Sequence, residues 1–479
     1  MSNKLEVFKE SIQNKKIAVL GLGISNRPLI KYLSGIGVSD LTGFDGAKEN
    51  SSAAVAIKED LKGYLKEIHL GENYLEKLLD DKYDYIFKTP VIRHDIPELL
   101  RAKEQGAIIT SEMEVFMQLC PATIVAITGS DGKTTTSTLV YEILKEEGYK
   151  TWLGGNIGNP LLKDIEEIKE TDMVVLELSS FQLHTMTASP HVAVVTNVLP
   201  NHLDVHKSYA EYIDAKSNIF ARQNAAAGDF AVLNLDYVVT AEYAKKVPGA
   251  FRFFSRKQVL DKGTYINGGY IVYKKYEKDE EIKITKISDI LLPGKHNVEN
   301  YMAASCAVID YVKPETINKV AKRFKGVEHR LEFVREFEGV KYYNGSIDTS
   351  PSRTNAALKT FGEKIILIAG GKDKGISYDE IGSPILDKVK ILILIGPTSK
   401  NIEEAINNEV LKRKINRETL NSQLEIIRCT SYEEVVDTAR SKSQKGDCVL
   451  LSPASTSFDM FKNFEERGNT FKKLVNELK

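Results

Sequence analysis

Residues Ile124–Tyr141, with the sequence IVAITGSDGKTTTSTLVY, decide the fold of the middle of the chain. The apolar run Ile124–Ile127 predicts a buried strand, and a helical pattern follows the loop Gly129–Thr134. This arrangement binds phosphate, because the N–H groups of such a loop and the dipole of the helix both favour an anion. Lys133 adds a full positive charge, and Thr134 can place its hydroxyl on Mg²⁺. The loop is shorter than the full P-loop pattern, so an ordinary tight turn is the alternative to the nucleoside triphosphate site that we predict.

The length and composition of the chain exclude several classes of protein. A chain of 479 residues exceeds a single core, which predicts roughly two to four domains. Its 66 acidic and 65 basic residues nearly cancel and form no long block of one sign, which argues against a nucleic-acid groove or a polybasic membrane patch. The four cysteines are scattered, the N-terminus lacks the apolar core of a signal peptide, and no apolar run is long enough to span a membrane. We therefore expect a cytoplasmic protein.

A second strand–turn–helix pattern opens the chain. The apolar run Ile17–Leu20 leads into the turn Gly21–Asn26 and a helix, and the next strand, Leu41–Phe44, ends at Asp45. An acid about twenty residues after paired glycines nearly matches the dinucleotide-binding fingerprint, although Asn26 stands where the third glycine belongs. The pattern therefore predicts a Rossmann-like domain. Its turn can bind NAD or any other pyrophosphate, including that of a nucleotide sugar.

Polar residues follow the strands that come after the phosphate loop. The run Met173–Leu178 carries Glu177 near its end, and the run Val192–Thr196 is followed by a polar cluster that includes His202. In a parallel sheet both residues would lie at the carboxyl ends of strands, where ligands bind. A glutamate in so apolar a run is costly unless it is paired or holds a metal. We therefore predict that it binds Mg²⁺ directly or through water, and a salt-bridged acid at the strand end is the alternative. Periodicity alone makes Lys216 a solvated helix lysine and residues 229–290 an antiparallel excursion.

Strands alternate with helices in the last third of the chain, which predicts a parallel sheet with crossover helices. The predicted strands are Val340–Asn344, Lys364–Ala369, Lys390–Ile395 and Cys448–Leu451. We therefore predict an α/β fold of three domains. They are a Rossmann-like domain at 1–111, a P-loop-type central ATPase domain with a mainly parallel sheet at 112–328, and a second Rossmann-like domain at 329–479.

Several stretches together resemble the Mur ligases, which are ATP-dependent ligases that build the peptide stem of bacterial cell-wall precursors. They are Gly129–Thr135, Glu177–Leu183, Asn201–Asp204 with Lys216, Gly294–Asn297 with Asn300, and His329–Arg330. Glu177–Leu183 and the C-terminal stretch Leu450–Phe471 look like the branch of the family that adds D-glutamate. The resemblance spans all three predicted domains.

The resemblance implies a reaction. ATP phosphorylates the carboxylate of UDP-N-acetylmuramoyl-L-alanine, the amine of D-glutamate attacks the acyl phosphate, and phosphate leaves. Two anions meet in the first step, so cations must neutralise them. The resemblance implies two Mg²⁺ ions, the first on Thr134 and Glu177 and the second on His202 and Lys216. In this family the matching lysine is carbamylated by CO₂, because a lysine ammonium itself cannot bind metal.

The resemblance also implies the binding and catalytic residues. The implied catalytic residues are Lys133, His202 and Lys216. The implied ATP-binding residues are Gly129, Ser130, Asp131, Gly132, Lys133, Thr134, Thr135, Asn297, Asn300 and Arg330. The implied substrate-binding residues are Ser25, Asn26, Asp45, Gly46 and Ala47 for uridine diphosphate, Asn156 for the muramoyl group, and Lys374, Ser457 and Phe464 for D-glutamate. We expect a monomer with no nucleic-acid partner and no membrane insertion.

Two positions depart from the family. Its members commonly have Asn-Asp-Ser where this chain has Asn344, Gly345 and Ser346, and the missing aspartate helps to hold ATP. Asp348, three residues further on, is the candidate replacement that we assign to the ATP site. Val91 stands where a glycine usually follows a proline, which puts the local turn in question because valine disfavours a positive φ. Neither position belongs to the implied Mg²⁺ set.

Three alternative functions are open at this point. The first is a ligase of the same fold that adds another amino acid or extends folate with glutamate, although the N-terminal turn and the stretch Ser452–Phe471 argue against folate. The second is an NAD-dependent oxidoreductase built on Gly21–Asp45, which would leave Gly129–Thr135 unexplained. The third is a nucleotide-binding scaffold without chemistry, given Gly345. For the ligase, we expect the domains to close around the ligands.

Overall fold

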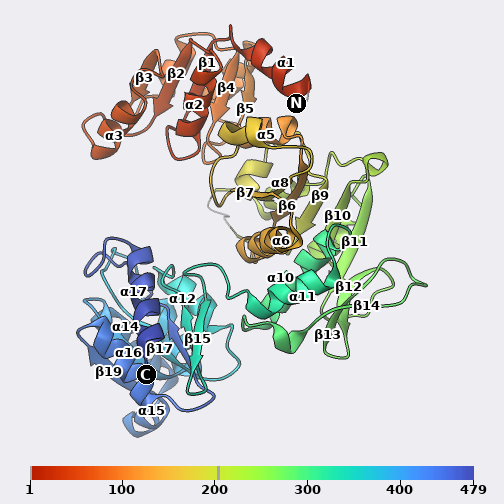
Figure 1. The fold of residues 1–479 in the computed structure, drawn as a ribbon. Coiled ribbons are helices and arrows are strands. Elements are labelled where there is room, and N and C mark those ends of the chain that lie inside the picture. The colour runs from red at the N-terminus through yellow and green to blue at the C-terminus, as the bar shows by residue number, and fades with distance from the viewer. Residues whose placement is uncertain (1–2, 202–204) are drawn as a thin grey trace. The chain divides into compact units, whose positions relative to one another are not determined.

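The computed structural model describes residues 3–201 and 205–479, which form a mixed α/β protein (Figure 1). They fall into two compact units, one made of Met1–Thr285 with Glu299–Val320 and the other of Lys286–Val298 with Ala321–Lys479. Within the described ranges, no helix is both long and apolar enough to cross a membrane. The α/β class is confirmed, whereas the division into three domains at residues 111 and 328 stays a prediction.

Five parallel strands form the first sheet, in the order β3-β2-β1-β4-β5. The strands are β1 Ile17–Leu20, β2 Leu41–Asp45, β3 Glu67–Leu70, β4 Tyr85–Lys88 and β5 Ile108–Thr110. The helices around them are α1 Asn3–Ile12, α2 Asn26–Gly35, α3 Ser52–Asp60, η1 Glu76–Leu79 and α4 Pro97–Glu104. The strand order reverses between the neighbours β1 and β4, as in a Rossmann-like sheet. The loops after these two strands therefore meet where such sheets bind ligands.

Nine strands form the second sheet, in the order β14-β13-β12-β11-β10-β9-β6-β8-β7. The strands are β6 Thr123–Thr128, β7 Thr151–Gly155, β8 Met173–Glu177, β9 Val192–Val195, β10 Phe230–Asn234, β11 Ala250–Ser255, β12 Gly263–Asn267, β13 Tyr270–Lys274 and β14 Ile282–Lys286. The helices of this region are α5 Glu112–Leu119, α6 Lys133–Glu147, η2 Leu162–Glu167, α7 Ser180–Leu183, α8 Tyr209–Ser217, η3 Ala225–Ala227, α9 Val238–Tyr243, η4 Ile287–Asp289, α10 Lys295–Val308 and α11 Pro314–Arg323. The strand β6 lies between β8 and β9 and is parallel to both. The carboxyl ends of these three strands therefore lie at one edge of the sheet.

The sequence prediction was wrong about part of residues 229–290. The strand β10 pairs in parallel with β9, and β11 pairs in parallel with β10, so both extend the parallel sheet. All the residues of β10, Phe230–Asn234, are buried, and a continuous buried run is typical of a parallel strand. The pairing of β12 with β13 is antiparallel, as predicted.

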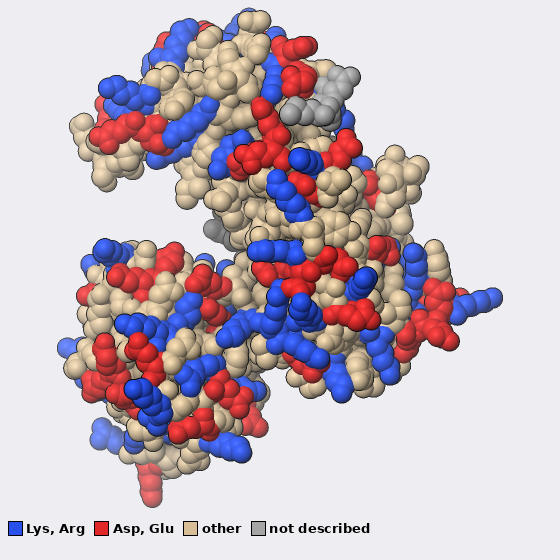
Figure 2. Space-filling model, viewed as in Figure 1, with Lys and Arg blue, Asp and Glu red and all other residues tan. Residues whose placement is uncertain are grey.

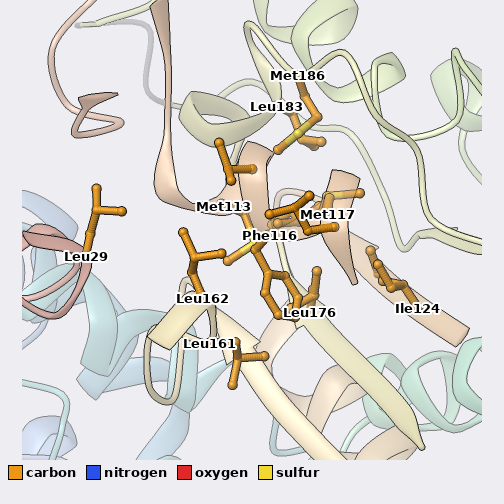
Figure 3. Close-up of a cluster of buried hydrophobic side chains, with 14 of the residues drawn as sticks. Leu29, Met113, Phe116, Met117, Ile124, Leu161, Leu162, Leu176, Leu183 and Met186 are labelled. Atoms are coloured by element: carbon orange, nitrogen blue, oxygen red, sulfur yellow. The ribbon is translucent and has the colours of Figure 1, made fainter. Parts of the chain in front are cut away.

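A hydrophobic cluster connects the first sheet with the second inside the same unit (Figure 3). It includes Leu29 of α2, Phe116 of α5 and Leu176 of β8. Helix α5 begins directly after Ser111, whose hydroxyl accepts a hydrogen bond from Glu114 N at 3.2 Å and caps the helix. The predicted end of the first domain is therefore the start of a helix that packs into this shared cluster.

Six strands form the third sheet, in the order β15-β16-β20-β17-β18-β19. The strands are β15 Glu332–Phe337, β16 Val340–Asn344, β17 Ile365–Ala369, β18 Val389–Ile395, β19 Glu425–Cys429 and β20 Cys448–Leu451. The helices are α12 Pro351–Leu358, η5 Asp379–Ile381, α13 Gly382–Lys388, α14 Ser399–Arg413, α15 Arg417–Gln423, α16 Tyr432–Lys442 and α17 Phe464–Glu477. Four strands were predicted, and all four are confirmed. The two unpredicted strands, β15 and β19, lie at the edges of the sheet, where β19 exposes Glu425 and Arg428.

Charged side chains of both signs are interspersed over the face of the molecule that Figure 2 shows. This mixture agrees with the formal net charge of −1. In this view, charge does not mark out a binding face, and the carboxyl ends of the parallel strands remain the better guide to a site.

Candidate active site

The loop after β6 can be built only with glycine at two positions. Gly129 has a φ of +154°, and a Cβ atom there would clash with the hydroxyl of Thr196. Gly132 has a φ of +79°, and a Cβ atom there would clash with the side-chain oxygen of Asn300. Gly132 directly precedes Lys133, the first residue of α6. The predicted strand, loop and helix start are thus confirmed, and the loop is packed closely enough to exclude other residues.

Two residues at the end of β9 fix the shape of this loop. The side-chain oxygen of Asn197 accepts a hydrogen bond from Asp131 N at 3.0 Å, and the carbonyl oxygen of Asn197 accepts one from Ser130 N at 2.9 Å. The hydroxyl of Thr196 donates to the carbonyl oxygen of Asp131 at 2.6 Å. Thr196 and Asn197 are not among the site residues predicted from the sequence. Their position directly after a buried parallel strand, beside the phosphate-loop strand, was the available signal.

Two lysines donate to the same carbonyl oxygen of the loop. Lys133 Nζ donates to Gly129 O at 2.9 Å and to Ser130 O at 3.0 Å. Lys216 Nζ, from α8, donates to Gly129 O at 2.8 Å and to Thr128 Oγ1 at 3.3 Å. The prediction from periodicity that Lys216 is solvated was wrong, because its side chain is only 1% exposed. Burial, together with the positive charge of Lys133, lowers the pKa of Lys216 well below its usual value.

The acid at the end of β8 is buried next to this pair of lysines. Glu177 Oε1 accepts a hydrogen bond from Asn156 Nδ2 at 2.7 Å, so two predicted site residues lie together. The other carboxylate oxygen, Oε2, is buried and has no hydrogen-bond partner among the residues that the structure describes. The negative charge of Glu177 opposes the lowering of the pKa of Lys216. A buried carboxylate oxygen with an open coordination position fits Mg²⁺, which prefers oxygen ligands.

Of the other predicted metal ligands, Thr134 is described by the structure and His202 is not. Thr134 is the second residue of α6 and therefore belongs to the helix start beside the phosphate loop. His202 lies outside the described residues. The donor set that is described, a hydroxyl and a carboxylate, is of the kind that binds a hard cation.

The turn after β1 is built by two of the residues predicted to bind the uridine nucleotide. Asp45 accepts hydrogen bonds from Leu22 N at 2.7 Å and from Ala47 N at 2.9 Å, one on each carboxylate oxygen. Asn26 Nδ2 donates to Leu20 O at 3.1 Å and to Gly21 O at 2.8 Å. Both side chains therefore shape the turn itself. The exposed predicted residues Ser25 and Gly46 lie at the same edge of the sheet.

The loop after β4 meets this turn. Gly21 has a φ of +83°, and a Cβ atom there would lie 2.6 Å from Thr89 Cγ2. The turn at Thr89 is closed by a hydrogen bond from Ile92 N to Thr89 O at 3.2 Å. Val91 does not have a positive φ and is 77% exposed. The valine is therefore accommodated without the backbone strain that its place in the sequence had suggested.

Asn300 and Asn297, predicted for the ATP site, lie on either side of the division between the two units. Asn300 is in the first unit, where its side-chain oxygen accepts a hydrogen bond from Thr136 Oγ1 at 3.3 Å. Asn297 is in the second unit, where its Nδ2 donates to Pro293 O at 2.6 Å. Arg330, also in the second unit, follows a buried His329 and is exposed.

Asp348 occupies the space that a side chain at position 345 would need. A Cβ atom on Gly345 would lie 2.7 Å from Asp348 Oδ2 and 2.8 Å from Leu451 O. Ser452 Oγ donates to Asp348 Oδ2 at 2.8 Å. Burial raises the pKa of Asp348 to about 6. A carboxylate is therefore present beside Gly345, although it is attached three residues further along the chain.

The predicted D-glutamate residues come from two loops and a helix start at the carboxyl ends of β17 and β20. Lys372 N donates to Thr456 O at 2.9 Å, and Thr456 N donates to Lys372 O at 3.2 Å. This pairing lays the loop of Lys374, which is exposed, beside the loop of Ser457, which is buried. The predicted Phe464 begins α17 and packs edge-on against the ring of His329, with the centroids 5.9 Å apart.

Two family models match the chain. The Mur ligase middle domain matches residues 127–308, and the glutamate ligase domain of Mur ligases matches residues 329–455. Proteins named UDP-N-acetylmuramoylalanine–D-glutamate ligase are relatives over the whole length. The one from Ruminiclostridium cellulolyticum is 55% identical over 482 residues, and the one from Acetivibrio thermocellus is 56% identical over 478 residues. Both alignments cover 100% of this chain and 100% of the relative.

Solved structures of other Mur ligases share the fold. UDP-N-acetylmuramate-alanine ligase from Thermotoga maritima has a TM-score of 0.54 at 17% sequence identity, with 97% of this chain and 100% of that chain covered. UDP-N-acetylmuramoyl-L-alanyl-D-glutamate–2,6-diaminopimelate ligase has a TM-score of 0.51 at 18% identity, with 86% of each chain covered. At these identities the likeness concerns the fold alone, whereas the relatives above half identity extend to the sequence of the whole chain. The chain therefore belongs to the Mur ligase family.

Proposed function

We propose that this chain is an ATP-dependent ligase that joins D-glutamate to UDP-N-acetylmuramoyl-L-alanine, with release of ADP and phosphate, in the synthesis of peptidoglycan precursors. The observation that carries the proposal is the identity of 55% over the full length with a relative that is named for this reaction. The phosphate loop with its two lysines and its buried glutamate supports the use of ATP.

Catalysis begins with charge neutralisation at the phosphate loop. The substrate carboxylate attacks the γ-phosphorus of ATP, the bond to the β–γ bridging oxygen breaks, and an acyl phosphate and ADP result. In the structure, Lys133 donates to two carbonyl oxygens. A bound phosphate would offer it a stronger, charge-assisted acceptor. The amine of D-glutamate then attacks the acyl carbon, loses a proton, and displaces phosphate. Lys133, His202 and Lys216 are the proposed catalytic residues.

We propose that Thr134 and Glu177 hold one Mg²⁺ ion and that His202 and Lys216 hold a second. Glu177 Oε2, which is buried and has no hydrogen-bond partner within the described ranges, supports the first of these sites. When bound, Mg²⁺ supplies positive charge that offsets the charge of the phosphate oxygens. For the second site, the Lys216 ammonium first releases one proton, and the neutral Nζ then adds to CO₂. An N–C bond forms, one C–O π bond opens onto oxygen, and a second proton leaves to solvent, which turns a cation into a carboxylate-like ligand. Burial of Lys216 beside Lys133 supports this step, because both disfavour the ammonium form.

The proposed ATP-binding residues are those of the phosphate loop and helix start together with residues of later segments. They are Gly129, Ser130, Asp131, Gly132, Lys133, Thr134, Thr135, Asn297, Asn300, Arg330 and Asp348. For Asp348, the support is the position of its carboxylate in the space beside Gly345, where the family commonly has an aspartate. The carboxylate is thus supplied from another position of the same turn.

The proposed substrate-binding residues fall into two groups. The first, for the uridine nucleotide and the muramoyl group, is Ser25, Asn26, Asp45, Gly46, Ala47 and Asn156. The second, for D-glutamate, is Lys374, Ser457 and Phe464. The pairing of the loops of Lys374 and Ser457 supports the second group, because one loop offers a cation and the other a hydroxyl to a dicarboxylate.

We further propose a cytoplasmic monomer with domains at 1–111, 112–328 and 329–479. The use of ATP and of a uridine nucleotide supports a cytoplasmic reaction.

Phosphate release tests the proposed function. The reaction contains ATP, Mg²⁺, UDP-N-acetylmuramoyl-L-alanine and D-glutamate, and each component is omitted in turn. We expect rapid phosphate release only in the complete mixture, with no NAD requirement. Replacement of D-glutamate by L-lysine or meso-diaminopimelate is the matched control. A preference for either of these amino acids would overturn the assignment of D-glutamate, and turnover without ATP would overturn the ligase.

A further inference from the structure

We propose that Arg93 is a positioning residue for Lys216, because it anchors helix α8 through Glu211. The proposal rests on the proposed function, in which Lys216 takes part in catalysis. Arg93 belongs to the loop after β4 of the first sheet, and α8 carries Lys216 in its last turn. The two residues of the anchor are 118 positions apart in the sequence and lie in the same unit.

Arg93 uses its whole guanidinium group at this place. Its NH2 and NH1 groups donate to the two oxygens of Glu211, at 2.8 and 3.3 Å. Its Nε and NH2 donate to the two oxygens of Asp95 at 2.8 and 3.0 Å, and its NH1 donates to Val205 O at 2.7 Å. Five hydrogen bonds match the five N–H donors of arginine, so the fork has one orientation. A lysine could carry the charge but could not reproduce this geometry.

Glu211 is the acceptor on which several donors converge. It lies in the first turn of α8, and besides Arg93 it accepts a hydrogen bond from Lys207 N at 2.6 Å. His184 Nε2 and His206 Nδ1 each lie 3.5 Å from one of its oxygens. The hydrogen bonds from Arg93 lower the pKa of Glu211 to about 2, so the carboxylate stays ionised at neutral pH. The start of α8 is therefore held from outside the helix.

Helix α8 contacts the phosphate loop at two places along its length. Tyr212, the neighbour of Glu211, has its hydroxyl 2.9 Å from Ser130 Oγ, and its ring centroid lies 4.7 Å from Lys216 Nζ. Lys216 Nζ reaches Gly129 O at 2.8 Å. A helix of nine residues is short and stiff, so a change at its first turn moves its last turn as well. Arg93 thereby fixes where Lys216 meets the loop.

This anchor also connects the turn after β1, proposed to bind the uridine nucleotide, with the phosphate loop. Arg93 follows Thr89 in the loop after β4, and Thr89 packs against Gly21 in the turn after β1. The turn proposed for the uridine nucleotide and the lysine at the phosphate loop are therefore linked through one loop and one helix. A misplacement of a catalytic group by about 1 Å is enough to cost a large factor in rate.

Three variants and one control test the anchor. Arg93→Lys keeps the charge and removes the fork, Glu211→Gln keeps the size and removes the charge, and the double variant combines them. Arg413→Lys is the matched control, because Arg413 forms a comparable fork with Asp387 and Glu409 in the second unit. We expect each single variant to lower kcat about tenfold, and the double variant to lower it no further, as for partners in one interaction. KM for D-glutamate should stay within about twofold of the parent, and thermal unfolding should confirm that all variants fold.

A second measurement does not depend on activity. Amide hydrogen exchange of residues 209–217 should be faster in Arg93→Lys and in Glu211→Gln than in the parent, and unchanged in Arg413→Lys. Unchanged exchange, or losses of kcat that add in the double variant, would overturn the anchor. If the parent itself showed no D-glutamate-dependent turnover, the proposed function would fail, and the exchange experiment would still decide whether Arg93 holds α8.

Discussion

Asp348→Asn should weaken ATP binding and stabilise the fold at the same time. The carboxylate of Asp348 is 9% exposed, and Ser452 Oγ donates to it at 2.8 Å. Asparagine has the same size, and its side-chain oxygen can still accept this hydrogen bond. The substitution therefore removes charge and little else, which makes the two effects separable.

The magnitudes follow from the burial of this carboxylate. A hydrogen bond to a charged group contributes about 1.5–3 kcal/mol, so its loss should raise KM for ATP roughly 10- to 100-fold. Burial raises the pKa of Asp348 to about 6 in the folded chain, above the ordinary value of 3.8. Because the folded form binds its proton more tightly than the unfolded form, the ionised carboxylate destabilises the fold, by roughly 3 kcal/mol at pH 8. The stability gained by Asp348→Asn should thus be full above about pH 6 and fade as the pH falls toward 4.

The assay combines ATP titration of phosphate release with thermal unfolding at pH 8 and at pH 5. Glu112→Gln is the matched control, because burial raises the pKa of this carboxyl to about 7 and it lies in α5, outside the proposed site. Glu112→Gln should raise the melting temperature at pH 8 in the same way but leave KM for ATP unchanged. Gly345→Asp should lower the melting temperature, because the added Cβ would lie less than 3 Å from both Asp348 Oδ2 and Leu451 O. If Asp348→Asn raises the melting temperature and leaves KM for ATP within twofold of the parent, Asp348 is only a buried acid and the ATP role is refuted.

Three further changes test the site itself. Gly132→Ala should abolish most turnover, because its Cβ would displace Asn300. Gly148→Ala is the control at the other end of α6: it has a φ of +110° but open space around it, so it should cost only about 1 kcal/mol of stability and little activity. Activity at saturating ATP compares the two variants, and equal losses would contradict the steric argument. Glu177→Gln should raise the Mg²⁺ concentration needed for half-maximal rate at least tenfold, measured by Mg²⁺ titration after chelation, and an unchanged titration would remove Glu177 from the metal set. Lys216→Ala should lose most activity, and intact-protein mass spectrometry under CO₂ should show one added CO₂ on the parent and none on the variant; full activity of Lys216→Ala would contradict its catalytic role.

Local patterns predicted much of the fold. Apolar runs that end at Gly21 and Gly129 predicted strands β1 and β6 and the turns after them, and four strands of the third sheet were predicted at nearly their observed bounds. The edge strands β15 and β19 were missed because charged residues such as Arg428 interrupt their apolar pattern, as is usual where one side of a strand faces water. The parallel pairing of β10 could not be predicted from its own residues, since pairing direction depends on the strand beside it.

The site was predictable where its chemistry is local in sequence and unpredictable where it depends on distant partners. The role of Lys133 could be predicted from the sequence of the loop beside it. Lys216, by contrast, has the periodicity of a solvated residue and was assigned to the site only by family resemblance. Its burial arises because α8 packs against the phosphate loop, 87 residues earlier in the chain. The contact of Arg93 with Glu211 spans 118 residues and leaves no mark in either local sequence.

The carbonyl oxygen of Gly129, which accepts a hydrogen bond from both lysines, has a consequence for how two small ligands affect each other. A phosphate that draws Lys133 away would change the surroundings of Lys216, and the proposed addition of CO₂ to Lys216 would change those of Lys133. If both binding events take place as proposed, they share one acceptor and are expected to be coupled. Such coupling is reciprocal, so each ligand would alter the affinity for the other by the same factor. The apparent affinity of the enzyme for ATP should then vary with the concentration of dissolved CO₂ in the medium.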